Sequence, residues 1–193
     1  MFYNQFHPSQ KIPYLTPDNI RSRGSTCLEV GGVGLNDLSQ GMEYQVWKLE
    51  VIGNTQVVLS NTSGYSELLF IDSNIKSVGL AFTQNMQKVI CIEHLDHSVD
   101  LYWFDTSVGA EVKTTYPGIR TARLTLDDKR VSQLINSDVV FAYIRNVDNA
   151  LCYRLQRERF EVEHVIGVFS ARTKLRNIGM NEHFRVQFEL QYP

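Results

Sequence analysis

The feature that most constrains this fold is the regular exchange between short β-type runs and turn residues. From about residue 44 onward, runs rich in β-branched and aromatic side chains follow one another, separated by clusters of Gly, Asn, Asp and Pro. Such runs are typical of strands, and such clusters are typical of tight turns. The predicted strands are Tyr44–Val51, Gln56–Leu59, Ser66–Ile71, Val78–Phe82, Lys88–Glu93, Asp100–Phe104, Ala122–Leu126, Asp138–Ile144, Ala150–Leu155 and Arg185–Leu190. We therefore expect an all-β fold built from antiparallel meanders.

Alternation within several of these runs indicates which face is buried. Apolar and polar residues take turns from Phe184 to Leu190 and again at Leu124-Thr125-Leu126. Because successive side chains of a strand point to opposite faces, this pattern places one face on a core and the other in water. The best helix candidates are Asp128–Ile135 and Arg154–Phe160, and the second is better explained as strand followed by turn.

Similar groups of strands recur along the chain. The residues Leu35, Leu80 and Leu124 occupy matching places in three segments and lie 45 and 44 residues apart. A period near 40–50 with several short strands per unit is typical of β-propeller blades. A β-sandwich is the equally weighted alternative, because similar strand lengths produce apparent repeats in any all-β chain. The predicted meanders span residues 31–71, 78–116 and 122–166, and a C-terminal strand follows at 184–190.

The first part of the chain has a different character. Residues 1–30 contain Pro8, Pro13 and Pro17, and proline at this density disfavours both helix and central strand. Four aromatic residues interrupt this polar stretch, namely Phe2, Tyr3, Phe6 and Tyr14. We predict an extended N-terminal arm whose aromatics contact an apolar surface of the same or a neighbouring subunit, followed by a single β domain over residues 31–193.

Composition excludes several classes of partner. The net charge is −2, and Lys and Arg are scattered rather than clustered, which argues against nucleic-acid binding. No apolar run approaches the roughly 18 residues of a membrane span, and the first residues lack the pattern of a secretory signal. The three cysteines are Cys27, Cys91 and Cys152, and their wide spacing favours buried free thiols made in a reducing cytoplasm.

The motifs of common catalytic and metal sites do not stand out. Glu93 to His97 with Asp100 is the one His/carboxylate cluster, but a strand would point His94 and His97 apart, so a solvated turn is favoured over a metal site. The pair Asp127-Asp128 could serve a glycosidase or bind calcium, yet a turn or helix cap explains it better. We therefore predict no catalytic residue, no metal ligand and no cofactor.

A charged aromatic stretch is the best interface candidate. Residues Tyr153 to Glu163 interleave Arg, Glu and aromatic side chains. Arginine forms bidentate pairs with carboxylates and is enriched at interfaces. We predict that Arg154, Arg157 and Arg159 contribute to a subunit contact or a sugar-binding surface. An exposed strand with ion pairs worth roughly 0–1 kcal/mol each is the alternative.

Aromatic residues in the predicted strands suggest a second kind of surface. Trp47, Trp103, Tyr102 and Tyr153 could form platforms for sugars, although their place in strand centres favours core packing.

The C-terminal two-thirds of the chain carries a family resemblance. The motifs are Gly31–Leu35, Leu80–Met86, Leu124–Arg130, Ser137–Arg145, Leu151–Glu163, Ile178–Asn181 and Arg185–Phe188. In this succession the chain resembles tail-associated virion structural proteins of short-tailed bacteriophages. The likeness covers about residues 31–193.

The resemblance implies a non-enzymatic tail component, such as a tail-fibre, collar or adaptor protein. Its expected partners are further copies of itself in a symmetric oligomer and other tail proteins, and its expected place is the virion tail. The alternative is a carbohydrate- or receptor-binding β module at the tail tip that recognises a host surface glycan. A glycosidase using Asp127 and Asp128 is the weakest of the three hypotheses.

Overall fold

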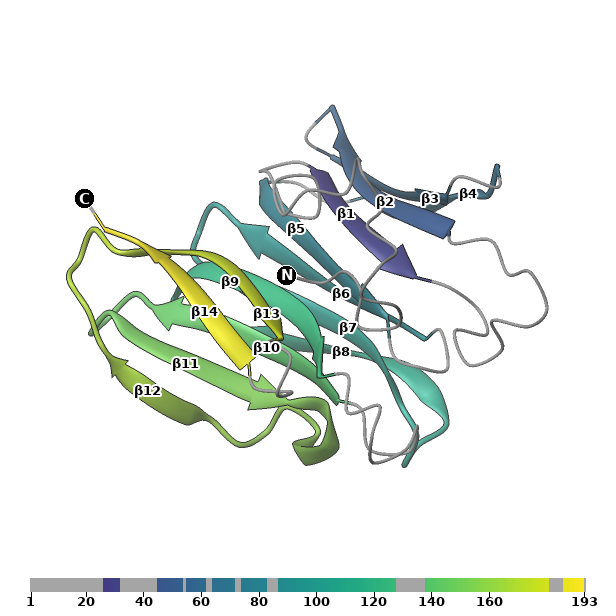
Figure 1. Ribbon diagram of the computed structural model, residues 1–193. Coiled ribbons are helices and arrows are strands. Elements are labelled where there is room, and N and C mark those ends of the chain that lie inside the picture. The colour runs from purple at the N-terminus through teal and green to yellow at the C-terminus, as the bar shows by residue number, and fades with distance from the viewer. Residues whose placement is uncertain are drawn as a thin grey trace, which may run out of the picture.

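The protein folds as antiparallel β-strands arranged in four sheets, as the computed structural model shows (Figure 1). The structure describes residues 26–31, 45–53, 55–61, 64–71, 74–82, 87–127, 138–180 and 186–192. Among these residues the one helical element is a single 3-10 turn, η4, at Gln156–Glu158. The prediction of an all-β, antiparallel fold is thus confirmed.

Three of the sheets have four strands, which follow one another in chain order. Sheet A comprises β1 (Thr26–Gly31), β2 (Gln45–Ile52), β3 (Gln56–Asn61) and β4 (Ser66–Ile71). Sheet B comprises β5 (Ile75–Phe82), β6 (Lys88–His94), β7 (Val99–Asp105) and β8 (Ala110–Tyr116). Sheet C comprises β9 (Ile119–Asp127), β10 (Asp138–Arg145), β11 (Ala150–Leu155) and β12 (His164–Val168). Sheet D has two strands, β13 (Lys174–Met180) and β14 (Val186–Gln191).

The sheets are layered in the order A, B, C, D (Figure 1). The first strands of successive sheets, β1, β5, β9 and β13, lie next to one another. Each interval between layers holds its own apolar core. The interpretation of these layers as propeller-like repeats or as a sandwich stays a prediction.

Strand β6 shows why the middle layers are stable. Val89 and Cys91 point into the core shared with sheet C, whereas Ile90 and Ile92 point into the core shared with sheet A. All four side chains are buried, so the strand is apolar along its length rather than alternating. Burying an aliphatic side chain of this size stabilises the folded state by about 1.5–3 kcal/mol. In a strand with two covered faces, the side chains on both faces contribute.

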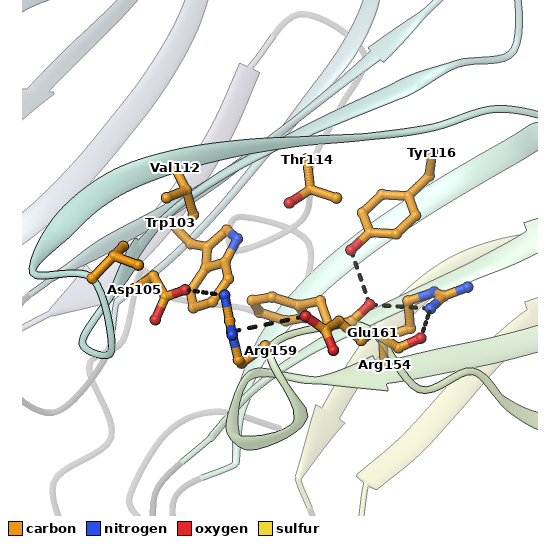
Figure 2. Close-up of a pocket in the computed structure, with 10 residues that line it drawn as sticks. Trp103, Asp105, Val112, Thr114, Tyr116, Arg154, Arg159 and Glu161 are labelled. Carbon is orange, nitrogen blue, oxygen red and sulfur yellow. Dashed lines mark hydrogen bonds and ion pairs between the residues drawn. The ribbon is translucent and has the colours of Figure 1, made fainter.

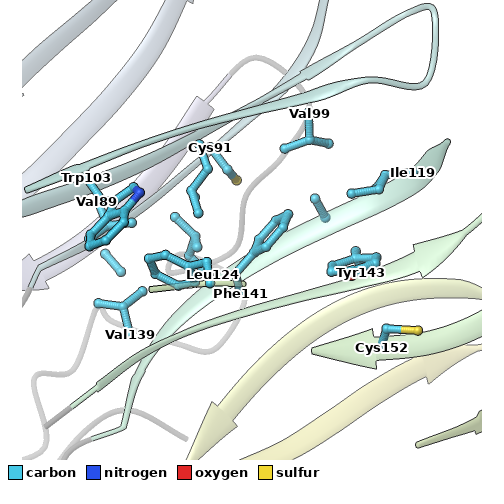
Figure 3. Packing of buried hydrophobic residues seen from close by; sticks show 14 of the residues in the cluster. Val89, Cys91, Val99, Trp103, Ile119, Leu124, Val139, Phe141, Tyr143 and Cys152 are labelled. Carbon is cyan, nitrogen blue, oxygen red and sulfur yellow. The ribbon is translucent and has the colours of Figure 1, made fainter. Parts of the chain in front are cut away.

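The largest core lies between sheets B and C (Figure 3). Phe141 on β10 lies at its centre and is fully buried, with the ring of Tyr116 from β8 at 5.4 Å and that of Tyr143 at 5.0 Å. Leu124 of β9 and Trp103 of β7 complete the contact between the two layers. Side chains from all four strands of sheet B and from β9, β10 and β11 of sheet C therefore meet in this one cluster.

Two of the cysteines are confirmed as buried free thiols. Cys91 faces sheet C, and Cys152 lies on β11. Burial raises the pKa of Cys91 to about 12 and that of Cys152 to about 11, since a thiolate is poorly solvated there. Both are therefore neutral, packing side chains near neutral pH.

The structure also contains strands that the sequence did not predict. These are β1, β8, β12 and β13. The irregular arm expected over residues 1–30 gives way to strand β1 at Thr26, after the last proline of the segment at Pro17. The aromatics Phe2, Tyr3, Phe6 and Tyr14 and the helix candidate Asp128–Ile135 lie outside the described residues.

Candidate functional site

The charged aromatic stretch forms a tight turn rather than a helix. Strand β11 ends at Leu155, η4 follows, and then Arg159 and Phe160 both adopt left-handed backbone angles with φ of 54° and 56°. The amide of Arg159 donates to the Gln156 carbonyl at 2.7 Å, and that of Phe160 donates to the Leu155 carbonyl at 3.0 Å. Two consecutive non-glycine residues in this region cost about 1–3 kcal/mol each, so other contacts must hold the turn.

Burial of Phe160 provides the first of these contacts. Its side chain is fully buried and meets the indole of Trp103 edge to face, with ring centroids 5.2 Å apart. Trp103 belongs to sheet B, and Phe160 lies in the turn between β11 and β12 of sheet C, so this contact joins two layers. A buried phenylalanine of this kind stabilises a fold by several kcal/mol, which exceeds the cost of its backbone strain.

Arg154 on β11 supplies the second set of contacts. Its Nη1 donates to the Phe160 carbonyl at 3.0 Å and to the Glu161 carbonyl at 2.6 Å, while its Nε donates to the Tyr143 hydroxyl at 2.8 Å. Nη2 lies 3.4 Å from Glu163 Oε2, and the guanidinium stacks 5.0 Å from the centre of the Tyr116 ring. One side chain thus ties the turn to sheets B and C.

The groups around Arg154 also form hydrogen bonds with one another. Glu163 accepts hydrogen bonds from Arg145 Nη1 at 2.6 Å and from the Tyr143 hydroxyl. Burial and the bond to Glu163 raise the pKa of Tyr143, so the phenol stays protonated and can donate. The Tyr116 hydroxyl donates to the Phe160 carbonyl at 2.9 Å. These charged and polar groups satisfy one another within the chain.

Arg159 pairs with an acid from the neighbouring layer. Its Nη2 lies 2.8 Å from Oδ2 of Asp105, the last residue of β7. The other oxygen, Oδ1, accepts hydrogen bonds from the Ser107 amide at 2.8 Å and its hydroxyl at 2.6 Å. The hydrogen bond from the Ser107 hydroxyl lowers the pKa of Asp105, and the charge of Arg159 lowers it further. Burial has the opposite effect but is outweighed. The carboxylate is therefore charged at neutral pH.

These groups surround a cleft between sheets B and C (Figure 2). Its volume is about 410 Å³. Aromatic rings from three segments line its inner wall, and charged side chains lie around it. The lining residues that matter for its chemistry are Trp103, Asp105, Thr114, Tyr116, Arg159 and Phe160. We take this cleft as the candidate functional site because it combines apolar walls, polar groups and backbone strain.

The three predicted interface arginines have different surroundings. Arg154 is largely buried and fully engaged within the chain, whereas Arg159 is half-exposed at the cleft and Arg157 is exposed on η4. A role of these residues in a subunit contact stays a prediction. Asp127 ends strand β9, and its partner in the acidic pair, Asp128, lies outside the described residues.

The His/carboxylate cluster lies in the β6–β7 hairpin, and the prediction of a solvated turn holds only for its tip: Asp96 is exposed, whereas Glu93, His94 and Asp100 are buried in sheet B. Asp96 accepts hydrogen bonds from the Ser98 amide and hydroxyl at 2.9 Å and 2.7 Å in the turn between β6 and β7. His94 Nε2 lies 3.1 Å from Asp100 Oδ2, so these two side chains face each other inside sheet B. Within the part of the chain that the structure describes, no three His, Cys, Asp or Glu side chains are grouped to hold a metal ion.

Asp100 is a buried member of that cluster with several polar partners. Lys113 Nζ lies 2.7 Å from its Oδ2, and the Thr115 hydroxyl donates to Oδ1 at 2.6 Å. Burial disfavours the charged carboxylate, but the hydrogen bonds from Lys113, Thr115 and His94 outweigh it and lower the pKa of Asp100. Because the folded pKa lies below the unfolded value of about 3.9, this stabilisation is present above that pH and is lost as pH falls through the folded value.

We therefore expect Asp100→Asn to reduce the free energy of unfolding at pH 7 by about 1–2 kcal/mol, the worth of hydrogen bonds to a charged group. The difference between the variant and the native chain should shrink as the pH falls below about 4. Urea unfolding at a series of pH values measures both. A difference that stays constant down to pH 2 would show that the carboxylate charge is not what stabilises this cluster.

A second surface feature lies on the outer face of sheet A, the side turned away from sheet B. Ile52 on β2 is 48% exposed, and Leu68 and Ile71 on β4 are 51% and 73% exposed. In the register of the sheet, Gln56 of β3 pairs with both Ile52 and Ile71, and Val58 pairs with Leu68. Ile52, Val58, Leu68 and Ile71 therefore share this face around Gln56, and we call this mainly apolar area the sheet A patch. The ion pair between Lys48 and Glu50, at 2.8 Å, lies beside it.

Comparison with known proteins leaves the chain without an assigned relative. No protein-family model matches it, and no curated protein or solved structure resembles it significantly. Within the described residues, no helix is long and apolar enough to cross a membrane.

Sequence reasoning found one half of the cleft and missed the other. It singled out the stretch from Tyr153 to Glu163, but not Asp105 or the aromatic contact between Trp103 and Phe160. These residues come from different layers, more than 50 positions apart in the chain. A single sequence contains no local signal for such a pairing, since it arises only when sheets B and C stack.

Proposed function

We propose that the chain is a non-enzymatic structural component of a bacteriophage tail, acting as a tail-fibre, collar or adaptor protein through assembly with copies of itself and with other tail proteins. The resemblance of its linked motifs to tail proteins of short-tailed phages supports the phage context. The sheet A patch is the observation that carries the assembly role.

The patch is suited to protein contact because it leaves large apolar side chains in water on one end of the stack. Sheets B and C bury such side chains against neighbours on both faces, whereas within the described part of the chain no second sheet covers Ile52, Leu68 and Ile71. Contiguous exposed apolar areas on soluble proteins commonly mark interaction sites. Covering these three side chains would contribute about 1 kcal/mol or more each.

We assign the patch to the N-terminal arm of a neighbouring copy. The arm contains Phe2, Tyr3, Phe6 and Tyr14, and it precedes β1, which belongs to the same sheet as the patch. Aromatic side chains match an aliphatic surface in chemistry and bring large contact areas. Every copy contains both the arm and the patch, so copies that place their arms on one another need no further surface to assemble. Such an exchange is a low-cost route to an oligomer.

Light scattering on the full chain at two concentrations tests this role. We expect a defined oligomer, and we expect the double variant Leu68→Glu/Ile71→Glu to shift it to monomer. Replacing Phe2, Tyr3, Phe6 and Tyr14 by Ser should have the same effect. Val147→Glu is the matched control, because Val147 is 88% exposed but lies in the turn between β10 and β11.

Two results would count against the proposal. A native chain that is monomeric at both concentrations does not assemble with itself in this way. If the oligomer persists in the patch variant but is lost in the Val147→Glu control, the contact between copies lies elsewhere.

A further inference from the structure

The cleft between sheets B and C has properties that an assembly role does not require. Its volume of about 410 Å³ falls within the roughly 300–1,000 Å³ of small-molecule pockets. It lies beside η4 and the β7–β8 hairpin, and it shares no lining residue with the sheet A patch. We propose that this cleft binds a neutral saccharide. The inference does not depend on the proposed tail function.

One buried polar atom of a cleft-lining residue points to a hydroxylated ligand. The indole Nε1 of Trp103 has no hydrogen-bond partner, although the residue is 95% buried. Asp105 Oδ2, by contrast, is already paired with Arg159 Nη2 at 2.8 Å. An indole N–H is a donor, and the oxygen of a hydroxyl group can accept from it. Buried polar groups left unpaired are costly, so a partner for them stabilises the site.

The charges of the cleft argue for a ligand without net charge. Asp105 and Glu161 balance Arg154 and Arg159. Arg154 has its donors committed to Tyr143, to backbone carbonyls and to Glu163, so it is not available to an anion. Phosphate and nucleotide sites present an excess of positive charge or free backbone amides, and this cleft has no such excess.

The apolar part of the wall fits the remaining surface of a sugar. The rings of Trp103, Tyr116 and Phe160 contribute to the lining. Figure 2 shows Trp103 and Tyr116 on the sheet B side of the space, across from Arg154 and Arg159. A pyranose ring has faces of C–H groups, which pack on aromatic carbon, and hydroxyls at its rim, which need polar partners. Thr114 adds one further hydroxyl to the wall.

The strained turn supports a functional use of this wall. Arg159 and Phe160 are the two adjacent left-handed residues, and both line the cleft. Elsewhere among the described residues the non-glycine positions with positive φ are Asn74, His97 and Asn149. Asn tolerates this conformation well and His is also enriched in it, whereas Arg and Phe are not favoured there. Strain of this kind concentrates at ligand sites, where it presents side chains in a set orientation.

Nitrogen-15 NMR of the full chain provides a direct test. The chain has two tryptophans, Trp47 and Trp103, so it gives two indole N–H signals, and Trp103→Phe identifies which is which. Titration with maltose, lactose and N-acetylglucosamine at millimolar concentrations should move the Trp103 signal to a saturating value with at least one sugar. Glucose 6-phosphate is the anionic control and should leave that signal in place.

Matched variants then separate binding from folding. Trp103→Phe keeps a ring but loses the donor, and it should weaken sugar binding roughly three- to tenfold, as the loss of one neutral hydrogen bond predicts. Tyr102→Phe removes a hydroxyl from the opposite face of the same strand and should leave the affinity unchanged. Backbone amide shifts of Thr114 and Phe160 follow binding in both variants, and thermal unfolding confirms that each is folded.

The proposal is overturned if the Trp103 signal stays still with every neutral sugar. It is also overturned if the Trp47 signal moves instead, or if glucose 6-phosphate binds more tightly than the neutral sugars. None of these outcomes bears on assembly, which light scattering measures separately.

Discussion

Replacing Arg154 with Ala is expected to lower the free energy of unfolding by about 3 kcal/mol. The guanidinium donates to the Tyr143 hydroxyl and to the carbonyls of Phe160 and Glu161, and it stacks on Tyr116. Its removal takes these bonds away, leaves Glu163 with Arg145 as its remaining arginine partner, and frees a turn that holds two strained residues. Urea unfolding measures the change.

Two comparisons make this prediction specific. Arg154→Lys keeps the charge but not the planar fork, so it should recover only part of the loss. Arg157→Ala changes an exposed arginine on η4 in the same stretch, and it should alter stability by no more than about 0.5 kcal/mol. Equal effects of Arg154→Ala and Arg157→Ala would mean that Arg154 does not organise the turn.

Gly79→Ala is expected to destabilise the protein by about 2 kcal/mol, through overpacking between sheets B and C. Gly79 pairs with Cys91 across β5 and β6, and a Cβ added to it would lie only 2.5 Å from Cys91 Sγ. It would also contact Leu124 Cγ of β9 at 3.8 Å. Because Cys91 is buried in the core between the two sheets, its sulfur can move away only by displacing packed side chains. The steric cost outweighs the entropy gained when an alanine replaces a glycine.

A double-mutant cycle isolates the clash. Gly79→Ala combined with Cys91→Ala removes the sulfur, so the double variant should be more stable than the sum of the two single effects predicts. Gly167→Ala on β12 is the matched control, because a Cβ there meets only Phe169 at ordinary contact distances of 3.7 Å and 3.8 Å. Additive effects at positions 79 and 91 would contradict the steric explanation.

The sequence allowed the central strands to be predicted, whereas the four strands it missed, β1, β8, β12 and β13, all lie at sheet edges. Strands β6, β7 and β10 bury both faces or alternate strongly, so their composition identifies them. Strand β8 reads Ala-Glu-Val-Lys-Thr-Thr-Tyr, with polar residues on its exposed face and edge. Its pairing with β7 defines it as a strand, and that pairing is a tertiary contact.

The candidate cleft, too, was only partly predictable from the sequence. Local composition identified Tyr153 to Glu163 as unusual, because charged and aromatic residues alternate there. It suggested an outward role for the arginines, yet Arg154 turns inward, since Tyr143, Tyr116 and Glu163 surround it with matching groups. Which arginine is buried depends on partners that lie 9 to 38 positions away in the chain, although all of them are close in space.

The sequence by itself therefore determined the fold class, the central strands and the burial of Cys91 and Cys152. These properties follow from side-chain periodicity and turn chemistry, which act over a few neighbouring residues. The tertiary structure alone decided the layering of the four sheets, the strained turn at Arg159 and Phe160, the contact between Phe160 and Trp103, and the cleft between sheets B and C. These arise from contacts between residues far apart in the chain, and their energies exist only once the sheets are stacked.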